Sequence, residues 1–147
     1  VVICGLPGSG KTTLAKELEQ SMPAVRFCPD DWFVALELDL WHQELRGRVE
    51  AIQWRLAQEL LALGGNVVIE FGSWAREERD ELRLRARELG AAVELRYLDA
   101  PIDELVRRVE ARAWEAPPIT RAHLEEWATL IEIPDAAELA LFDTPLP

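Results

Sequence analysis

Residues 5–12 carry the spacing G-x-x-x-x-G-K-[ST] without deviation. Glycines at these positions let the backbone curl, so that successive N–H groups point at the oxygens of a bound phosphate chain. The Lys11 ammonium can reach the outer phosphates, and the Thr12 hydroxyl can hold the magnesium ion that bridges them. The segment therefore predicts a nucleotide site with Mg²⁺. The residues expected to contact the nucleotide are Gly8, Ser9, Gly10, Lys11, Thr12 and Thr13.

Two adjacent carboxylates, Asp30 and Asp31, follow a second apolar run at residues 24–28. We expect an extended chain there, in which neighbouring side chains point in opposite directions, so that only one carboxylate faces the site. That carboxylate could accept the proton of an acceptor hydroxyl, or orient the hydroxyl towards the γ-phosphate of a nucleotide. The alternative is a helix cap beside a solvated carboxylate, because Asp is favoured just before a helix.

Four apolar runs alternate with segments of helical spacing. The runs predict strands at residues 1–4, 24–28, 66–71 and 92–99, and the spacing predicts helices at 11–20, 41–63, 75–89, 102–114 and 120–132. This alternation predicts an α/β fold: a parallel sheet of four to five strands in a three-layer α/β/α sandwich, forming a single domain over residues 1–147. Ligands of such sheets bind beyond the carboxyl ends of the strands. The tail at 133–147 holds no convincing fifth strand.

Composition narrows the class of partner. A net charge of −11 argues against broad electrostatic attraction to nucleic acid or to anionic lipid. No apolar run approaches the ~20 residues that cross a bilayer, so we expect no membrane span. The two cysteines, Cys4 and Cys28, end predicted buried strands. They are interpreted as small core residues of a cytoplasmic protein. The oligomeric state is left open.

The order of these motifs resembles a known family. "GLPGSGKTTLA" followed by "PDDWF" is similar to small P-loop kinases related to the polynucleotide 5′-kinase domain, chloramphenicol phosphotransferase and zeta toxin. The resemblance implies a P-loop NTPase fold of the nucleoside-kinase type, with ATP and Mg²⁺ as cofactors. In the polynucleotide kinases the second strand ends in N-R-D-D, whose first Asp is the general base. By that match the base is Asp30, with Asp31 as its neighbour.

Residues 104–119 are similar to the short helical lid of this family, whose pattern is E-L-x-x-R-x-x-x-R. The resemblance implies a lid at about 107–120 whose arginines, Arg108 and Arg112, close over the ATP phosphates. Their spacing of four places both on one helical face. The alternative is surface ion pairing with nearby glutamates. Arg112 lies nearer the proline-marked hinge and is the better candidate, and Trp114 is a candidate cover for the adenine.

The departures from the family bear on the acceptor. Pro29 and Phe33 stand where polynucleotide kinases place arginines that hold the phosphate of the nucleic acid, which disfavours a nucleic-acid acceptor. Aromatic residues near the expected site could instead stack on a sugar or a flat small molecule. Those residues are Trp32, Phe33, Trp41 and Trp74, whereas Trp54 and Trp127 are assigned to the core, and His42 and His123 to surface or packing roles.

These observations predict an ATP-dependent kinase that transfers the γ-phosphoryl group to a hydroxyl of a small molecule such as a metabolite, sugar or antibiotic. Lys11 and Arg112 would stabilise the transferred group, Thr12 would hold the metal, and Asp30 would activate the acceptor. Glu70, at the end of a strand, either orients metal-bound water, contacts the acceptor or has a structural partner. The alternatives are a polynucleotide 5′-hydroxyl kinase and a nucleotide-binding ATPase module that acts through a partner protein.

Overall fold

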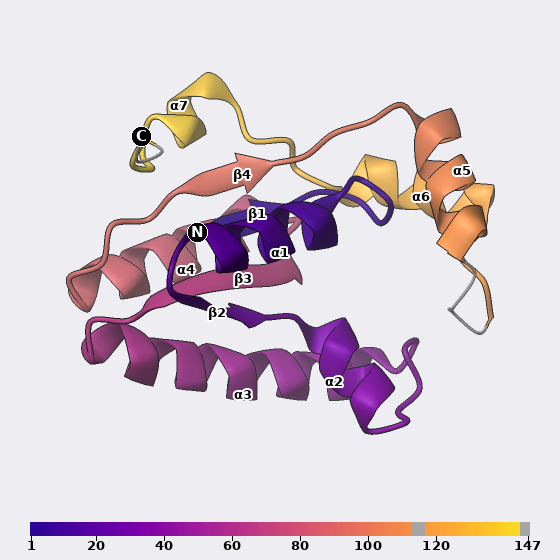
Figure 1. Ribbon diagram of the computed structural model, residues 1–147. Coiled ribbons are helices and arrows are strands. Elements are labelled where there is room, and N and C mark those ends of the chain that lie inside the picture. The colour runs from indigo at the N-terminus through magenta and orange to yellow at the C-terminus, as the bar shows by residue number, and fades with distance from the viewer. Residues whose placement is uncertain (113–116, 145–147) are drawn as a thin grey trace.

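The structure is a computed structural model that describes residues 1–112 and 117–144 (Figure 1). It confirms the α/β fold and the parallel sheet, which has four strands in the order β2-β3-β1-β4. The strands are β1 (Val2–Cys4), β2 (Ala24–Phe27), β3 (Asn66–Gly72) and β4 (Leu95–Tyr97). The helices are α1 (Lys11–Ser21), α2 (Pro29–Ala35), α3 (Gln43–Ala62), α4 (Arg76–Glu88), α5 (Ile102–Arg112), α6 (Arg121–Leu130) and α7 (Ala136–Leu139).

Side chains that alternate along the strands separate the two helical layers. Val2 and Cys4 pack with α3 and α4 in one core cluster, whereas Ile3 packs with α1 on the opposite face of the sheet. This period of two is the geometry of a strand that is covered on both faces. The predicted three-layer sandwich is therefore confirmed. Both cysteines are buried and free.

The chain around Asp30 and Asp31 is helical, so the predicted extended segment was wrong. Pro29 occupies the first turn of α2, where its missing N–H is tolerated and its fixed φ suits a helix. The two carboxylates follow in the same turn, where they complement the positive end of the helix. Neither carboxylate is the N-cap, which is Cys28. Pro29 is the sequence signal for the start of this helix, and the alternative interpretation of the two carboxylates, as residues beside a helix start, is closer to the structure.

Helices α5 and α6 lie beyond the end of the sheet towards which the strands point (Figure 1). They pack together through a third core cluster that includes Leu6 of the phosphate-binding loop, Leu105 and Leu124. The clustered leucines place α5 against the loop, at the edge where ligands of parallel sheets bind. Within the described parts of the chain, no helix has the length and apolar character that crossing a membrane requires.

Candidate active site

The loop between β1 and α1 has the geometry of a phosphate cradle. Gly8 and Gly10 have φ angles of 83° and 100°, in the left-handed region that favours glycine. A Cβ added at Gly10 would meet no heavy atom within 4 Å, so the space beside the loop is open. Helix α1 begins at Lys11, so its positive end also faces this space. The loop therefore fits a nucleotide phosphate chain.

Lys11 is held close to the loop. Its Nζ donates a hydrogen bond of 3.0 Å to the Leu6 carbonyl oxygen. Desolvation of the ammonium lowers the pKa of Lys11 to about 8, although the negative charges of Glu70 and Asp30 oppose this shift. A bound polyphosphate would supply the missing counter-charge and favour the protonated amine.

The side-chain oxygens of Thr12, in the first turn of α1, and Glu70, near the end of β3, lie side by side. The Thr12 hydroxyl donates to Oε1 of Glu70, and Nη1 of Arg26 donates to Oε2 over 2.9 Å. Glu70 is buried, and these partners offset the cost of its charge. A hydroxyl and a carboxylate side by side are the hard oxygen ligands that Mg²⁺ prefers, so these residues fit a magnesium ion held together with phosphate oxygens.

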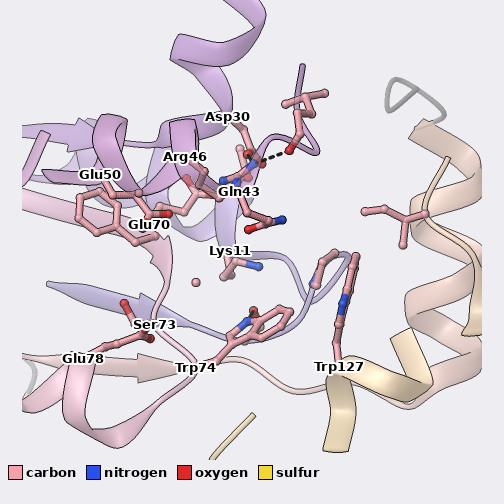
Figure 2. Close-up of a pocket in the computed structure, with 18 of the residues that line it drawn as sticks. Lys11, Asp30, Gln43, Arg46, Glu50, Glu70, Ser73, Trp74, Glu78 and Trp127 are labelled. Atoms are coloured by element: carbon pink, nitrogen blue, oxygen red, sulfur yellow. Dashed lines mark hydrogen bonds and ion pairs between the residues drawn. The ribbon is translucent and has the colours of Figure 1, made fainter. Parts of the chain in front are cut away.

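Asp30 is aimed by an arginine of α3. Nη2 of Arg46 donates to Oδ1 of Asp30 over 2.6 Å (Figure 2). The guanidinium of Arg46 also lies 5.3 Å from the ring centroid of Phe33. Asp31 pairs with Arg26 instead. The prediction that only one of the two carboxylates faces the site was wrong, because both line the cavity beside the phosphate-binding loop and only Asp30 also reaches the space beside α3.

Two cavities meet at the phosphate-binding loop. The first, which we call the loop cavity, has a volume of about 650 Å³ and lies between the loop, α2 and α5. The second, the α3 cavity, has a volume of about 620 Å³ and lies between α3, the segment after β3, and α6. Both cavities are lined by Lys11, Thr12, Asp30 and Arg112. Four predicted site residues from three elements are thus brought to the boundary between the two spaces.

The two lid arginines occupy different places on α5. Nη1 of Arg108 donates to the Gly8 carbonyl oxygen over 3.1 Å, while its Nε donates to Glu104 over 2.6 Å. Arg108 thus both contacts the loop and forms the surface ion pair that was its alternative. Arg112 lines both cavities and lies close enough for its charge to lower the pKa of Lys11. Trp114 lies outside the described residues.

Three tryptophans from distant segments form one wall of the α3 cavity. Trp127 of α6 lies between Trp74 and Trp41, with ring-centroid distances of 5.7 Å and 6.1 Å. Nε1 of Trp41 donates to the Pro117 carbonyl oxygen over 2.9 Å, which joins the α2–α3 connection to the segment before α6. The wall is therefore fixed by contacts on both sides. Trp127 packs against the α5–α6 core cluster as assigned, but it also lines the cavity.

The other predictions about aromatic residues have mixed outcomes. Phe33 is fully buried beneath Arg46 and cannot stack on an acceptor, so that part of the prediction was wrong. Trp32 is absent from the lining of both cavities. Trp54 packs against the core as assigned. The two histidines have packing and capping roles: His42 caps α3, and His123 stacks on Trp127 with 5.5 Å between ring centroids.

A buried ion pair holds the loop that carries Trp74. Nε and Nη2 of Arg79 donate to the Glu138 carboxylate over 2.6 Å and 2.9 Å, and its Nη1 donates to the carbonyl oxygens of Ser73 and Trp74. Ser73 has a φ of 46°, which is uncommon for a residue with a side chain. Strain of this kind persists where the surroundings impose it, and Arg79 imposes it here.

Comparison with known proteins identifies the family of this chain. The AAA domain family matches residues 1–134. The chain belongs to this family. No curated protein matches it.

Among solved structures, a chain of the Pnkp1/Rnl/Hen1 RNA repair complex is similar, with a TM-score of 0.72 and 22% identity over 95% of this chain and 43% of that one. A gluconokinase from Sinorhizobium meliloti has a TM-score of 0.63 and 18% identity, over 92% and 75% of the two chains. A second structure of the Pnkp1/Rnl/Hen1 complex matches with 26% identity and a TM-score of 0.62, over 73% and 38%. The chain thus spans less than half of the repair-complex chains. Its fold is that of small P-loop kinases.

Several residues of the site were not predicted from the sequence. Arg46, Glu50 and Arg79 are charged residues on helices, where such residues usually face solvent. One available signal was Arg26, a cation inside an otherwise apolar strand, which requires a buried partner.

Glu50 lines the α3 cavity, and burial, reinforced by the charge of Glu78 and opposed by Arg46, raises its pKa to about 7.

Proposed function

We propose that this protein is an ATP-dependent kinase that transfers the γ-phosphoryl group of Mg·ATP to a hydroxyl of a small molecule. The observation that carries the proposal is the meeting of two cavities at Lys11, Thr12, Asp30 and Arg112. In-line transfer requires a nucleotide and an acceptor to approach one point from opposite sides. The loop cavity suits the nucleotide, and the α3 cavity suits the acceptor.

The loop cavity supplies the contacts for the triphosphate. Backbone N–H groups of the loop would bind the phosphate oxygens, with Lys11 at the outer phosphates and Arg108 and Arg112 closing from α5. Arginine suits this role because its planar guanidinium binds two phosphate oxygens and stays charged. Thr12 would hold Mg²⁺ with Glu70 beside it, and the ion supplies charge neutralisation for the β- and γ-phosphates.

Asp30 would receive the proton of the acceptor. The hydroxyl oxygen forms a bond to the γ-phosphorus, the bond to the β–γ bridging oxygen breaks, and ADP leaves with that electron pair. The hydroxyl proton passes to the Asp30 carboxylate, whose direction is set by Arg46. Because the transition state of such transfers is loose, positioning and charge stabilisation by Lys11 and Arg112 contribute more than the strength of the base.

The test is acceptor-dependent production of ADP. The protein would be incubated with Mg·ATP and a panel of hydroxyl compounds, including sugars, polyols and hydroxylated antibiotics, while ADP release and phosphorylated product are measured together. We expect at least one compound to raise ADP release and to gain one phosphoryl group per ADP. The ATPase-module alternative would be favoured if no compound changed the rate of ADP release and if another protein bound this chain in one nucleotide state but not in the other.

A nucleic-acid 5′-hydroxyl is the second candidate acceptor. It is supported by the likeness to chains of an RNA repair complex. The carboxylate of Glu78 in the α3 cavity opposes it, together with that of Glu50 above its pKa of about 7, because both would repel a phosphodiester backbone. A 5′-hydroxyl oligonucleotide in the same panel decides: phosphorylation that weakens steeply with salt would favour this second function.

A further inference from the structure

Gly47 lies inside α3, where a glycine is unfavourable. It is the fifth residue of a 20-residue helix, and glycine there costs about 1 kcal/mol relative to alanine. Its φ is not positive, and a Cβ added to it would meet no heavy atom within 4 Å. Neither the backbone conformation nor the packing of the protein therefore requires glycine at this position.

The position faces the α3 cavity. Gln43, Arg46, Gly47 and Glu50 line the cavity together, at the spacing of one face of a helix over two turns. Because a Cβ at residue 47 would meet no heavy atom within 4 Å, a side chain there has room to extend into the opening of this cavity. The missing side chain thus exposes the helix backbone to whatever occupies the cavity.

The opposite wall of the cavity is aromatic. In Figure 2 the side chains of Gln43 and Arg46 lie on one side of Lys11, and those of Trp74 and Trp127 lie on the other. The indole of Trp74 is held by a hydrogen bond of 3.4 Å from its Nε1 to the Gly5 carbonyl oxygen. A fixed aromatic face opposite a bare helix backbone, with an amide and an arginine nearby, suits a ring that has an apolar face and hydroxyl groups at its rim.

The charge of the cavity excludes one class of ring. Beyond the four residues shared with the loop cavity, the charged side chains described in its lining are Arg46, Glu50, Glu70 and Glu78. Arg46 is already paired with Asp30, and Glu70 with Arg26, so Glu78 and Glu50 leave an excess of negative charge, which grows as the pH rises through the pKa of Glu50 at about 7. A carboxylate or phosphate on the acceptor would be repelled there, whereas a hydroxyl or an ammonium group would be accepted.

We infer that Gly47 selects the acceptor: an uncharged or cationic sugar ring lies against the α3 backbone at Gly47, with its other face towards Trp74. This inference rests on the proposed function for the identity of the site as an acceptor site. It commits to a sugar without negative charge, in contrast to a sugar acid or a nucleic-acid end.

The test measures binding of four defined probes to the full chain in the presence of ADP and Mg²⁺. The probes are glucose, glucosamine, gluconate and a 5′-hydroxyl pentathymidylate, and binding is followed by calorimetry and ligand-observed NMR. We expect glucose and glucosamine to bind at least tenfold more tightly than the other two. Tighter binding of gluconate or the oligonucleotide, or no binding of either sugar, would overturn the inference.

Substitution of Gly47 provides the second measurement. Gly47→Ala should raise the melting temperature and yet weaken sugar binding, and Gly47→Leu should weaken it at least tenfold while the dissociation constant of ATP stays within twofold. The matched control is Ala51→Leu, which places the same leucine side chain one turn along α3 at an exposed position outside the cavity lining. Sugar binding that Gly47→Leu leaves unchanged would overturn the inference.

The failure of this inference and that of the proposed function are distinguishable. If glucosamine binds and Gly47→Leu blocks it, but no phosphoryl group is transferred to it or to any other hydroxyl compound, the inference stands and the kinase proposal fails. If an acceptor is phosphorylated at the same rate by the wild type and by Gly47→Leu, the kinase proposal stands and the role of Gly47 is wrong.

Discussion

The loop cavity and the α3 cavity share four residues but are built in different ways. The loop cavity includes one continuous stretch of chain, residues 8–13, which offers backbone N–H groups and the start of a helix, and charged side chains of α2 and α5 complete its lining. The α3 cavity takes its lining from side chains of α3, the segment after β3, and α6. Recognition by backbone is insensitive to most substitutions, whereas recognition by side chains changes with each of them. On the proposed assignment, substitutions are therefore expected to change the acceptor side of the site more readily than the nucleotide side.

The largest effect is expected where the two cavities meet. Lys11→Ala removes the ammonium group that is proposed to stabilise negative charge on the phosphoryl group during its transfer. We therefore expect turnover to fall by about a thousandfold or more. ADP release would be measured with saturating ATP and acceptor. Lys16→Ala, at an exposed position of α1, is the matched control and should keep normal activity. If the Lys11→Ala variant turned over at a rate near that of the wild type, Lys11 would have no role in the proposed transfer.

Asp30→Asn should impair phosphoryl transfer without impairing ATP binding. Removing the general base should lower kcat by roughly a hundredfold to ten-thousandfold, while the affinity for ATP changes little. Rapid-quench turnover and nucleotide binding would be measured on the same protein. The control is Asp31→Asn, because Asp31 pairs with Arg26 and not with Arg46. If Asp30→Asn transfers at the wild-type rate, the assignment of the base is wrong.

Arg46→Gln should affect only the acceptor side. Loss of its hydrogen bond leaves the Asp30 carboxylate without its fixed direction, and we expect kcat to fall by about tenfold with little change in ATP affinity. Because the two residues act as a unit, the double variant Asp30→Asn with Arg46→Gln should be no slower than Asp30→Asn alone. Additive losses would show that Arg46 acts on the reaction independently of Asp30.

The pH dependence of ATP binding tests the role of Lys11 in the loop cavity. The pKa of Lys11 in the free protein is lowered to about 8, and bound phosphates favour its charged form. ATP affinity should therefore be constant below pH 8 and fall by about tenfold for each pH unit above it, with proton uptake on binding. Calorimetry in buffers of different ionisation enthalpy would measure both. Affinity that stays level to pH 9.5 would contradict the lowered pKa.

The smallest effect concerns Glu50 and stability. Its pKa in the folded protein, about 7, lies above the ordinary 4.5, so its contribution to stability is present at low pH and is lost as the pH rises through 7. Glu50→Gln should therefore stabilise the protein relative to the wild type by on the order of 1 kcal/mol at pH 8, allowing for partial solvent screening, and by less at pH 5. Urea unfolding at both pH values tests this. An equal difference at the two pH values would mean that Glu50 titrates normally.

Local sequence determined the parts of the protein in which neighbours along the chain make the contacts. Glycine and lysine spacing at residues 5–12 specified the phosphate-binding loop, and apolar runs alternating with helical spacing specified the layers and the parallel sheet. The short helix α2 was missed because a segment of seven residues carries few periodic positions, although Pro29 marked its first turn.

Only the tertiary structure decided what surrounds the α3 cavity. Arg46 meets Asp30 across 16 positions, and Arg79 meets Glu138 across 59. Trp127, whose helical spacing indicated only a core position, also forms part of the cavity wall because α6 packs beside the segment after β3. Helical periodicity tells which face of a helix is apolar, but it does not tell which charged side chain of the other face meets a partner. Those pairings depend on the distances between elements, which folding sets and sequence spacing does not express.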